Sequence, residues 1–295
     1  MRIVVTGREG QIVRSLAERA AGSAVEIISL GRPEFDLSAS ADDIAAAVKA
    51  AGPDVIVSAA AYTRVDRAEA ERDLTFAINE AGPRALAGAA RCIGVPMVHL
   101  STDYVFDGSK DSPYIETDNP RPAGVYGASK LAGEQAVLEE QGNTAVLRTA
   151  WVYSPFGSNF VKTMLRLAGD RNEVSVVADQ RGNPSSALDI ADGILRVAAN
   201  LFERPDANLR GVFHMTGGGE ATWAEFAEAI FAASAQTGGP VASVKPIFAR
   251  DFPTAARRPA NSRLDSSKLA ESHGVVLPDW RSSLPQVVAR LVNAG

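Results

Sequence analysis

The stretch RIVVTGREGQIV, residues 2–13, decides the fold class of this chain. Its β-branched first half is typical of a buried strand, and Gly7 and Gly10 fall where that strand turns into a helix. Unpaired N–H groups at a helix N-terminus favour a pyrophosphate, and glycine lets the backbone approach it closely. We therefore expect a dinucleotide phosphate site here, with an unliganded glycine turn as the alternative. Val13 replaces the third glycine of the usual pattern, which predicts a slightly displaced helix.

Outward from this stretch, strand-like and helix-like segments alternate. Such alternation predicts a Rossmann-type, doubly wound parallel sheet in an α/β fold, with helices on both faces. Strands are expected at 2–6, 24–30, 53–59, 95–102 and 144–152, and helices from about 10, at 40–51, at 66–92 and from about 126.

The texture changes after residue 151, where glycine and proline are spread between the helical patterns. We expect residues 1–150 to form an NAD(P)-binding domain and residues 151–295 to form mainly a smaller α/β substrate-binding lobe. Helices are predicted near 187–203 and 222–236, and GVFHMT (211–216) could return to the main sheet as a strand. The polar, proline-rich segment 107–122 predicts a long loop with a functional role.

Composition limits the classes of function. The 295 residues carry 35 acidic and 30 basic side chains without a basic run, which argues against a nucleic-acid partner. There is no apolar run of the roughly 18 residues that a membrane helix needs and no signal-peptide pattern at the start, so we expect a cytoplasmic protein. The single cysteine, Cys92, is expected to be a structural residue on a helix.

The three histidines and the aromatic stripe of the C-terminal half have ordinary structural explanations. His99 and His214 lie in apolar strands and are expected to be core residues, whereas His273 precedes a glycine at a helix end. The stripe TWAEFAEAIF has helical spacing, which predicts core or a subunit contact. No metal-ligand set can be read from the sequence, so we expect no metal.

The end of the second strand suggests the cofactor. Sites that prefer NAD usually place an acidic side chain there, but this strand ends Ser29-Leu30-Gly31-Arg32. Arg32, with Arg8 from the glycine turn, would suit a 2′-phosphate through charge-assisted hydrogen bonds. NADPH is therefore favoured and NADH is the alternative; both arginines could equally be solvated surface residues.

The motif YGASK places Tyr126 and Lys130 four residues apart, on one face of a helix. A nearby ammonium group favours the phenolate, which would lower the tyrosine pKa toward neutrality and suit proton exchange with a carbonyl oxygen. The motif STDYVFDG at 101–108 would place Thr102 at the carboxyl end of a parallel strand, where ligands bind in such sheets.

With these motifs the chain resembles the extended short-chain dehydrogenase/reductases, and among them the dTDP-4-dehydrorhamnose reductase family. The resemblance covers nearly the whole chain, although Ser58 stands where the family commonly has asparagine. The matching segments are TGREGQ (6–11), FDLS (35–38), AAAYTRVDRAE (59–69), STDYVFDG (101–108), YGASKLAGE (126–134), LRTAWVY (147–153), NFVKTML (159–165), ADQRGNP (178–184) and RPANSRLD (258–265).

The resemblance implies NADPH-dependent reduction of the C4 ketone of dTDP-4-dehydro-L-rhamnose, by a protein that could be a homodimer. It implies a catalytic triad of Thr102, Tyr126 and Lys130. The cofactor would contact Gly10, Gln11 and Ile12 at the pyrophosphate, Asp36 and Leu37 on the adenine side, and Ala61, Tyr62 and Thr63 in between. The sugar nucleotide would contact Asp103, Trp151, Asn159, Arg258 and Arg263, the two arginines being candidates for its diphosphate.

Two other functions compete with this interpretation. A sugar-nucleotide dehydratase or epimerase shares the fold, but a dehydratase would carry an acidic pair after the threonine, whereas here Asp103 precedes Tyr104. A non-catalytic protein resembling the beta regulatory subunit of methionine adenosyltransferase would keep much of the same pattern. The intact Thr102, Tyr126 and Lys130 favour an enzyme.

Overall fold

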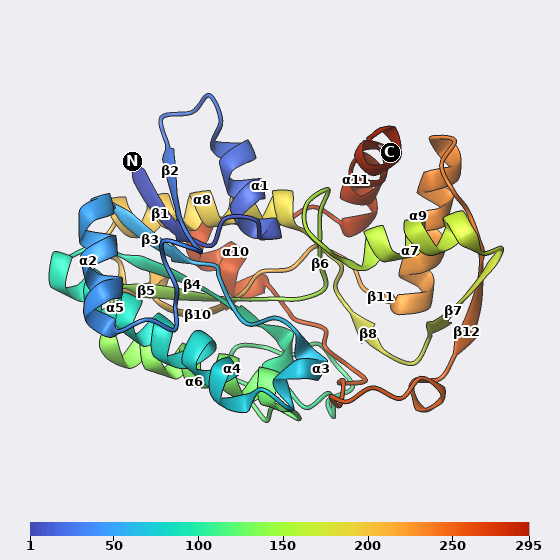
Figure 1. The fold of residues 1–295 in the computed structure, drawn as a ribbon, viewed down its shortest axis with the longest axis horizontal. Coiled ribbons are helices and arrows are strands. Elements are labelled where there is room, and N and C mark those ends of the chain that lie inside the picture. Colours follow the sequence, from blue (N-terminus) through green and yellow to red (C-terminus); the bar gives the residue numbers. More distant parts are fainter. Residues whose placement is uncertain (295) are drawn as a thin grey trace.

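The computed structural model describes residues 1–294 and has a six-stranded parallel sheet at its centre (Figure 1). The sheet order is β10-β5-β4-β3-β1-β2, and every neighbouring pair is parallel. The α/β, Rossmann-type fold expected from the sequence is thereby confirmed. The strands are β1 (Arg2–Thr6), β2 (Glu26–Leu30), β3 (Val55–Ser58), β4 (Met97–Thr102), β5 (Thr144–Thr149) and β10 (Gly211–His214).

Both faces of the sheet are covered by helices, which is why its central strands are almost continuously apolar. Ile3, Val4 and Val5 of β1 are all fully buried. One face packs on α1 (Gln11–Ala20), α8 (Ala187–Glu203) and α10 (Ser267–His273). The other packs on α2 (Ala41–Ala51), α5 (Gly82–Ile93) and α6 (Val125–Glu140).

The remaining C-terminal elements form a lobe with a hydrophobic core of its own, on the right of Figure 1. The aromatic stripe of α9 packs into this core, as expected for a structural helix, and a capping box between Thr222 and Glu225 begins the helix. The lobe contains α7 (Phe160–Asp170), α9 (Trp223–Gln236), α11 (Trp280–Asn293), the parallel pair β7 (Glu173–Val177) and β12 (Ser243–Ile247), and the short pairs β6 (Val152–Tyr153) with β9 (Ser185–Ser186) and β8 (Arg181–Gly182) with β11 (Ala221–Thr222).

The structure differs from expectation in three segments. The helix expected at 66–92 is divided into α3 (Val65–Ala68), α4 (Arg72–Phe76), a π-helical turn η1 (Ala77–Ala81) and α5. The strand expected at 144–152 stops at Thr149, because Trp151 adopts a left-handed backbone with φ of 46°. Cys92 lies on a helix as expected, but its side chain is exposed rather than packed.

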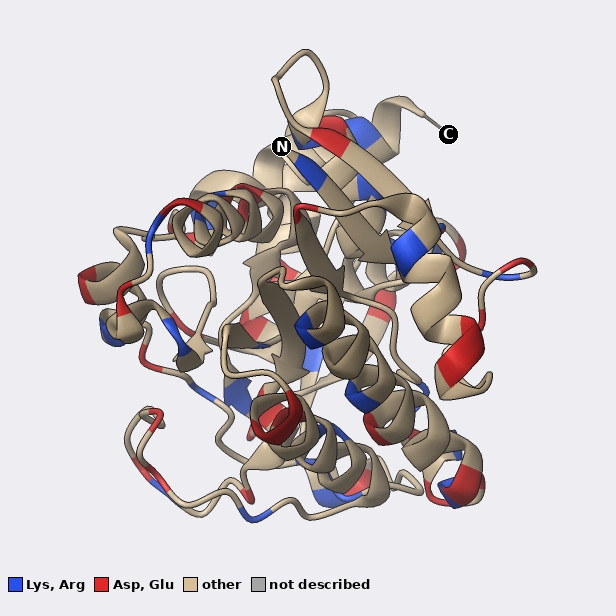
Figure 2. Ribbon diagram, turned by 90° about the vertical axis from the view of Figure 1, so that its left-hand side faces the viewer, with Lys and Arg blue, Asp and Glu red and all other residues tan. Residues whose placement is uncertain are grey.

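Short 3₁₀ turns complete the described chain, at η2 (Asp103–Val105), η3 (Ala207–Leu209) and η4 (Ala249–Asp251). His99 and His214 are buried and hydrogen-bonded, to the Ser58 hydroxyl and to backbone carbonyls respectively, as expected for core histidines. Basic and acidic residues are intermixed along the helices (Figure 2). Within residues 1–294 no helix is long and apolar enough to cross a membrane.

Candidate active site

A trench runs along the carboxyl edge of the sheet, at the point where the strand order reverses between β1 and β3. In open α/β sheets this reversal opens a crevice between the two strand ends. Here the hydroxyl of Thr6 spans the reversal and accepts the backbone N–H groups of Ala59 and Ala60, each at 3.0 Å. The first turn after β1 and the first turn after β3 are therefore held together at the floor of the trench.

Two cavities of about 440 and 520 Å³ make up this trench, and they share Gly7, Ala60, Ala61 and Thr63. Together the residues that line the two cavities extend from the end of β2 to helix α6. Every residue expected to bind the cofactor lines one or both of them: Gly7, Gly10, Gln11, Ile12, Arg32, Asp36, Leu37, Ala61, Tyr62, Thr63, Tyr126 and Lys130.

The middle of the trench is shaped to admit a phosphate group. Gly7 has a left-handed backbone with φ of 103°. Gly10 is the N-cap of α1 and brings no side chain to cap the helix, and a Cβ added to it would meet no heavy atom within 4 Å. The first N–H groups of α1 therefore face open space, which fits the pyrophosphate of a dinucleotide.

The glycine turn tolerates Val13 by close packing. The valine is buried against the sheet, and its Cγ2 would lie 3.2 Å from a Cβ placed on Gly7. The side chain thus packs against the turn at Gly7.

The β2 end of the trench carries charge. Arg32 is bound to Asp36 by an ion pair of 2.6 Å, and this hydrogen-bonded partner together with Ser38 lowers the pKa of Asp36 to about 2. Arg8 is paired with Glu34 at 2.6 Å. Two arginines that the sequence analysis missed, Arg64 and Arg67, line the same cavity.

The other end of the trench is lined by Tyr126 and Lys130 of the expected triad, and Thr102 lies next to Tyr126. Thr102 is the last residue of β4, and Tyr126 and Lys130 lie one turn apart on α6. The ammonium group of Lys130 is buried and donates a hydrogen bond of 2.6 Å to the carbonyl of Leu100. Burial lowers the pKa of Lys130 to about 8.

The electrostatic expectation for Tyr126 was wrong in direction. Desolvation raises the pKa of its phenol to about 12, and the hydrogen bond with Thr102 offsets this only in part. The lysine does not lower it, because the ammonium group is directed at the Leu100 carbonyl. The phenol is thus held in its protonated, proton-donating form.

The glycines of YGASKLAGE explain how α6 comes so close to β4. A Cβ on Gly127 would lie 2.1 Å from the carbonyl oxygen of Tyr104, and one on Gly133 would lie 2.1 Å from that of Asn79. Neither position admits a side chain, so the helix sits directly on η2 and on the π-helical turn. This contact sets Tyr126 beside Thr102, with the ring of Tyr104 edge-on to it at 5.6 Å.

Asp103 is buried behind the triad. Its carboxylate accepts a hydrogen bond of 2.9 Å from the hydroxyl of Thr102, and its second oxygen has no hydrogen-bond partner among the described residues. Burial raises the pKa of Asp103 to about 6.

Trp151 and Asn159, expected to contact substrate, are engaged inside the protein. The indole of Trp151 stacks on Trp223 with ring centroids 3.5 Å apart, and a Cβ on Gly182 would come within 2.4 Å of it. Asn159 caps α7 and donates a hydrogen bond of 3.0 Å to the side chain of Gln11. One face of the indole is therefore covered, and Asn159 joins the lobe to the first helix of the trench.

The two arginines expected at the diphosphate differ in how many of their polar groups are bound within the protein. Arg258 forms an ion pair of 2.8 Å with Asp66, while its buried Nε has no partner among the described residues. It lines a cavity of about 790 Å³ in the lobe, together with Phe160 and Trp223.

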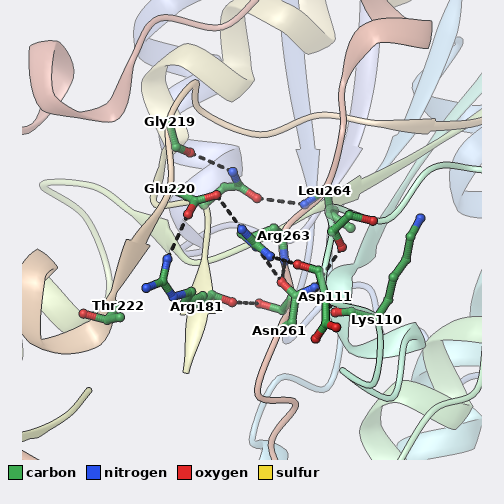
Figure 3. A network of polar contacts seen from close by, with 12 residues as sticks. Lys110, Asp111, Arg181, Gly219, Glu220, Thr222, Asn261, Arg263 and Leu264 are labelled. Atoms are coloured by element: carbon green, nitrogen blue, oxygen red, sulfur yellow. Dashed lines mark hydrogen bonds and ion pairs between the residues drawn. The ribbon is translucent and has the colours of Figure 1, made fainter. Parts of the chain in front are cut away.

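Arg263, in contrast, lies inside a network that joins three segments (Figure 3). It donates to Glu220 and Asn261, each at 2.8 Å, and to the carbonyl of Asp111 in the 107–122 loop. The structure therefore does not bring Arg263 to the trench with Tyr126; it makes this residue an anchor of the loop.

Four buried polar residues next to the triad were missed by sequence reasoning. Asn79 binds the backbone of Tyr62 and the hydroxyl of Ser129. Ser101, Glu134 and Arg148 form a second group under the end of β4. Only the two charged residues gave a signal in the sequence, because each lies in an otherwise apolar segment: Glu134 four residues after Lys130, and Arg148 inside a strand. Among residues 1–294 no three His, Cys, Asp or Glu side chains cluster to hold a metal.

Comparisons with known proteins agree with this geometry. Residues 1–293 match the family model described as RmlD substrate binding domain. The chain is 50% identical over 295 residues to a dTDP-4-dehydrorhamnose reductase of Sinorhizobium fredii, covering 100% of this chain and 99% of the relative. It is 44% identical over 299 residues to one of Burkholderia thailandensis, covering 99% and 100%.

A solved structure is also similar over nearly the full length. The dTDP-4-dehydrorhamnose reductase of Bacillus anthracis in complex with NADP has a TM-score of 0.90 and 36% identity, covering 97% of this chain and 98% of that one.

Proposed function

Because the chain belongs to the RmlD substrate binding domain family, with relatives named dTDP-4-dehydrorhamnose reductase, we propose that it is an NADPH-dependent reductase of dTDP-sugars. The reaction is the reduction of the C4 ketone of dTDP-4-dehydro-L-rhamnose to dTDP-L-rhamnose. The observation that carries the proposal is the single trench that joins the glycine turn, Arg32 and the Tyr126–Lys130 pair.

Tyr126 and Thr102 act on the ketone oxygen, and Lys130 acts on the cofactor beside it. NADPH, when bound, supplies the hydride that goes to the C4 carbon. Tyr126 gives its phenolic proton to the oxygen as negative charge develops there, and its protonated state in the structure suits this role. Thr102 donates a hydrogen bond to the same oxygen, and Lys130 binds the nicotinamide ribose.

The cofactor is held mainly by backbone. The free N–H groups at the start of α1 take the pyrophosphate, and the space at Gly10 lets it approach. At the β2 end, Arg32 receives the 2′-phosphate, which would replace Asp36 as one of its partners. The neighbouring Arg64 and Arg67 add positive charge to this end.

The sugar nucleotide is proposed to lie between the trench and the lobe. The 790 Å³ cavity is lined in part by aromatic and aliphatic side chains that suit a thymine ring, and Arg258, which lines the same cavity, offers its guanidinium group to the diphosphate. Trp151 and Asp103 border the sugar, whereas Asn159 and Arg263 act through the protein contacts described above.

One assay tests the activity. Purified protein is mixed with NADPH and enzymatically generated dTDP-4-dehydro-L-rhamnose, the absorbance of NADPH is followed, and the sugar product is identified. Consumption of one NADPH per dTDP-L-rhamnose formed is the expected result. Binding of NADPH without turnover would contradict the proposal and favour a non-catalytic regulatory protein.

The same assay separates the related enzyme class. A 4,6-dehydratase or a 4-epimerase returns its hydride to the product and causes no net loss of NADPH absorbance. Release of water from a dTDP-hexose, or inversion at C4 without cofactor consumption, would place the chain in that class. The absence of a second carboxylate after Asp103 argues against the dehydratase.

A further inference from the structure

The ends of α6 and β4 are joined by three side chains spaced four residues apart on the helix. Tyr126 meets Thr102, Lys130 donates to the carbonyl of Leu100, and Glu134 accepts from the hydroxyl of Ser101. Three consecutive residues of the strand are therefore fixed by three successive turns of the helix. The first two contacts belong to the proposed reaction, whereas the third has no assigned role.

The carboxylate of Glu134 is fully enclosed. The side chain is 2% exposed, and both of its oxygens accept hydrogen bonds from Arg148, at 2.9 and 3.2 Å from Nε and at 2.7 Å from Nη2. Arg148 stands opposite Ser101 in the register of β4 and β5, and its guanidinium lies 5.1 Å from the ring centroid of Phe106. The geometry leaves the carboxylate a single orientation.

Stability alone is a weak reason for such a group. A buried ion pair gains little over apolar side chains of the same volume, since removing two charges from water is costly. An apolar pair at positions 134 and 148 would fill the same space between α6 and β5. We therefore expect the Glu134–Arg148 pair to have an effect on the neighbouring site of Tyr126 and Lys130.

We propose that Glu134 is a positioning residue for the reduction: its carboxylate, oriented by Arg148, fixes Ser101 next to the Leu100 carbonyl that receives Lys130, and keeps the ammonium group of Lys130 charged. The inference rests on the proposed reductase function. Burial lowers the pKa of Lys130, whereas the negative charge of Glu134 acts in the opposite direction and raises this pKa. Without that charge, Lys130 would lose its proton in the range where the enzyme must work.

Other charged or titratable groups near this end of α6 do not replace Glu134. The pKa of His99 is held well below its usual value by burial, so this histidine is neutral at the pH values where Lys130 titrates. Arg148 is positively charged and therefore cannot stabilise the ammonium group in place of Glu134. The remaining groups are Tyr126 on the same helix, Asp103 in η2 and Glu69, which accepts the N–H of Val125; all three are unchanged by substitution at 134.

The test is the pH profile of kcat/KM in Glu134→Gln. Removing the charge leaves Arg148 unpaired near Lys130, so the alkaline limb of the profile should move down by about one pH unit or more. KM for NADPH should change less than kcat. The matched control is Glu139→Gln, on the same helix, where the exposed pair with Arg84 at 3.4 Å is lost; its profile should match that of the unsubstituted protein.

A double variant keeps the test decisive if the single variant folds poorly. Glu134→Gln/Arg148→Met removes the unpaired guanidinium, and its alkaline limb should return part of the way to that of the unsubstituted protein. An alkaline limb that stays within about 0.2 pH unit of the original in both variants would overturn the proposal and leave the pair a purely structural one.

A readout without turnover separates this inference from the proposed function. The chain has only six lysines, so the Lys130 side chain can be followed by NMR titration of labelled protein and assigned with Lys130→Met. Its pKa, about 8 in the structure, should fall in Glu134→Gln and stay in place in Glu139→Gln. If the unsubstituted protein shows this titration but reduces no dTDP-sugar, the proposed function fails; if it is active and the Lys130 titration is the same in all variants, the inference fails.

Discussion

The residues expected to bind the cofactor in the first half of the chain and those expected to bind the substrate in the C-terminal lobe were inferred from the same kind of motif, yet they differ in the structure. All twelve residues expected at the cofactor line one continuous trench. In the lobe, Asn159 caps a helix, Arg263 anchors a loop and Trp151 stacks on Trp223. Of the four residues that were expected to contact the substrate from the lobe, only Arg258 keeps a buried polar atom without a partner among residues 1–294.

The difference follows from what each site is made of. The glycine turn acts through the backbone N–H groups at the start of α1, whose place is set by a strand and a helix, so their position in the sequence nearly fixes their position in space. Long side chains such as Arg258 and Arg263 can reach several carboxylates, and in a folded protein most of their buried donors form hydrogen bonds with protein groups. Side-chain sites are consequently harder to read from a motif than backbone sites.

The largest effect is expected in the nucleotide-binding half, at its reacting end. Replacing Tyr126 by Phe removes the proton donor and should lower kcat by about 10³-fold, within the range of general acid catalysis. The dissociation constant of NADPH, measured by fluorescence titration, should stay within about twofold. Tyr153→Phe is the control, since this hydroxyl binds the Trp280 carbonyl in the lobe core. Comparable losses in both variants would contradict a chemical role for Tyr126.

The two lobe arginines give a second and smaller effect. Arg258→Ala should raise KM for the dTDP-sugar about 10- to 100-fold, the size of a lost charge-assisted hydrogen bond. Arg263→Ala should change KM much less but should expose the 107–122 loop to limited proteolysis, because the Asp111 contact is lost. The reverse pattern, with Arg263 controlling KM and Arg258 the loop, would overturn the distinction between them.

Asp103 gives a prediction about stability. Its folded-state pKa of about 6 lies above the ordinary 3.8, so the folded protein retains a proton that the unfolded chain releases. The free energy of unfolding should therefore fall as the pH rises from about 4 to 6, and Asp103→Asn should remove the loss. At pH 7 this variant should be more stable by on the order of 3 kcal/mol, measured by urea denaturation, and equal to the original near pH 3.

A matched substitution controls for the general effect of removing a carboxylate. Asp111→Asn changes an exposed aspartate of the neighbouring loop and should give no comparable gain at pH 7. Destabilisation by Asp103→Asn at pH 7 would mean that its carboxylate is satisfied in the folded state, contrary to the unpartnered oxygen described above.

The smallest effect concerns cofactor choice. Arg32→Ala should weaken NADPH about tenfold more than NADH, because only the former carries a 2′-phosphate. Arg8→Ala, which removes the arginine paired with Glu34, should discriminate less. Equal weakening of both cofactors, measured by fluorescence titration, would remove Arg32 from the phosphate site and leave Arg64 or Arg67 as the discriminating residue.

The parts that could be predicted are those with a strong local pattern. The apolar run of β1, the glycine turn and the position of Thr102 at a strand end all depend on residues adjacent in sequence. The π-helical turn could not be predicted, since it accompanies the hydrogen bonds of Asn79 with Tyr62, 17 residues earlier. The ion pair of Arg258 with Asp66 spans 192 residues and has no local signal.

Other features depend on the fold as a whole. The left-handed backbone at Trp151 ends β5 early and allows the indole to meet Trp223, which an apolar strand pattern conceals. The direction of the Tyr126 pKa shift depends on how far the phenol is desolvated and on where Lys130 points, and neither can be derived from their spacing.

Because β10 returns to the edge of the main sheet, the sheet cannot be completed during synthesis until β10 has been made. His214 follows Thr149 by 65 residues, so at ~5–20 residues per second the ribosome adds them in roughly 3 to 13 seconds. During that interval β5 has no neighbour on its outer side, and the helix α10, which covers the same face, is synthesised only after β10. A nascent chain in this state presents an open strand edge, at which chaperone binding or aggregation would begin.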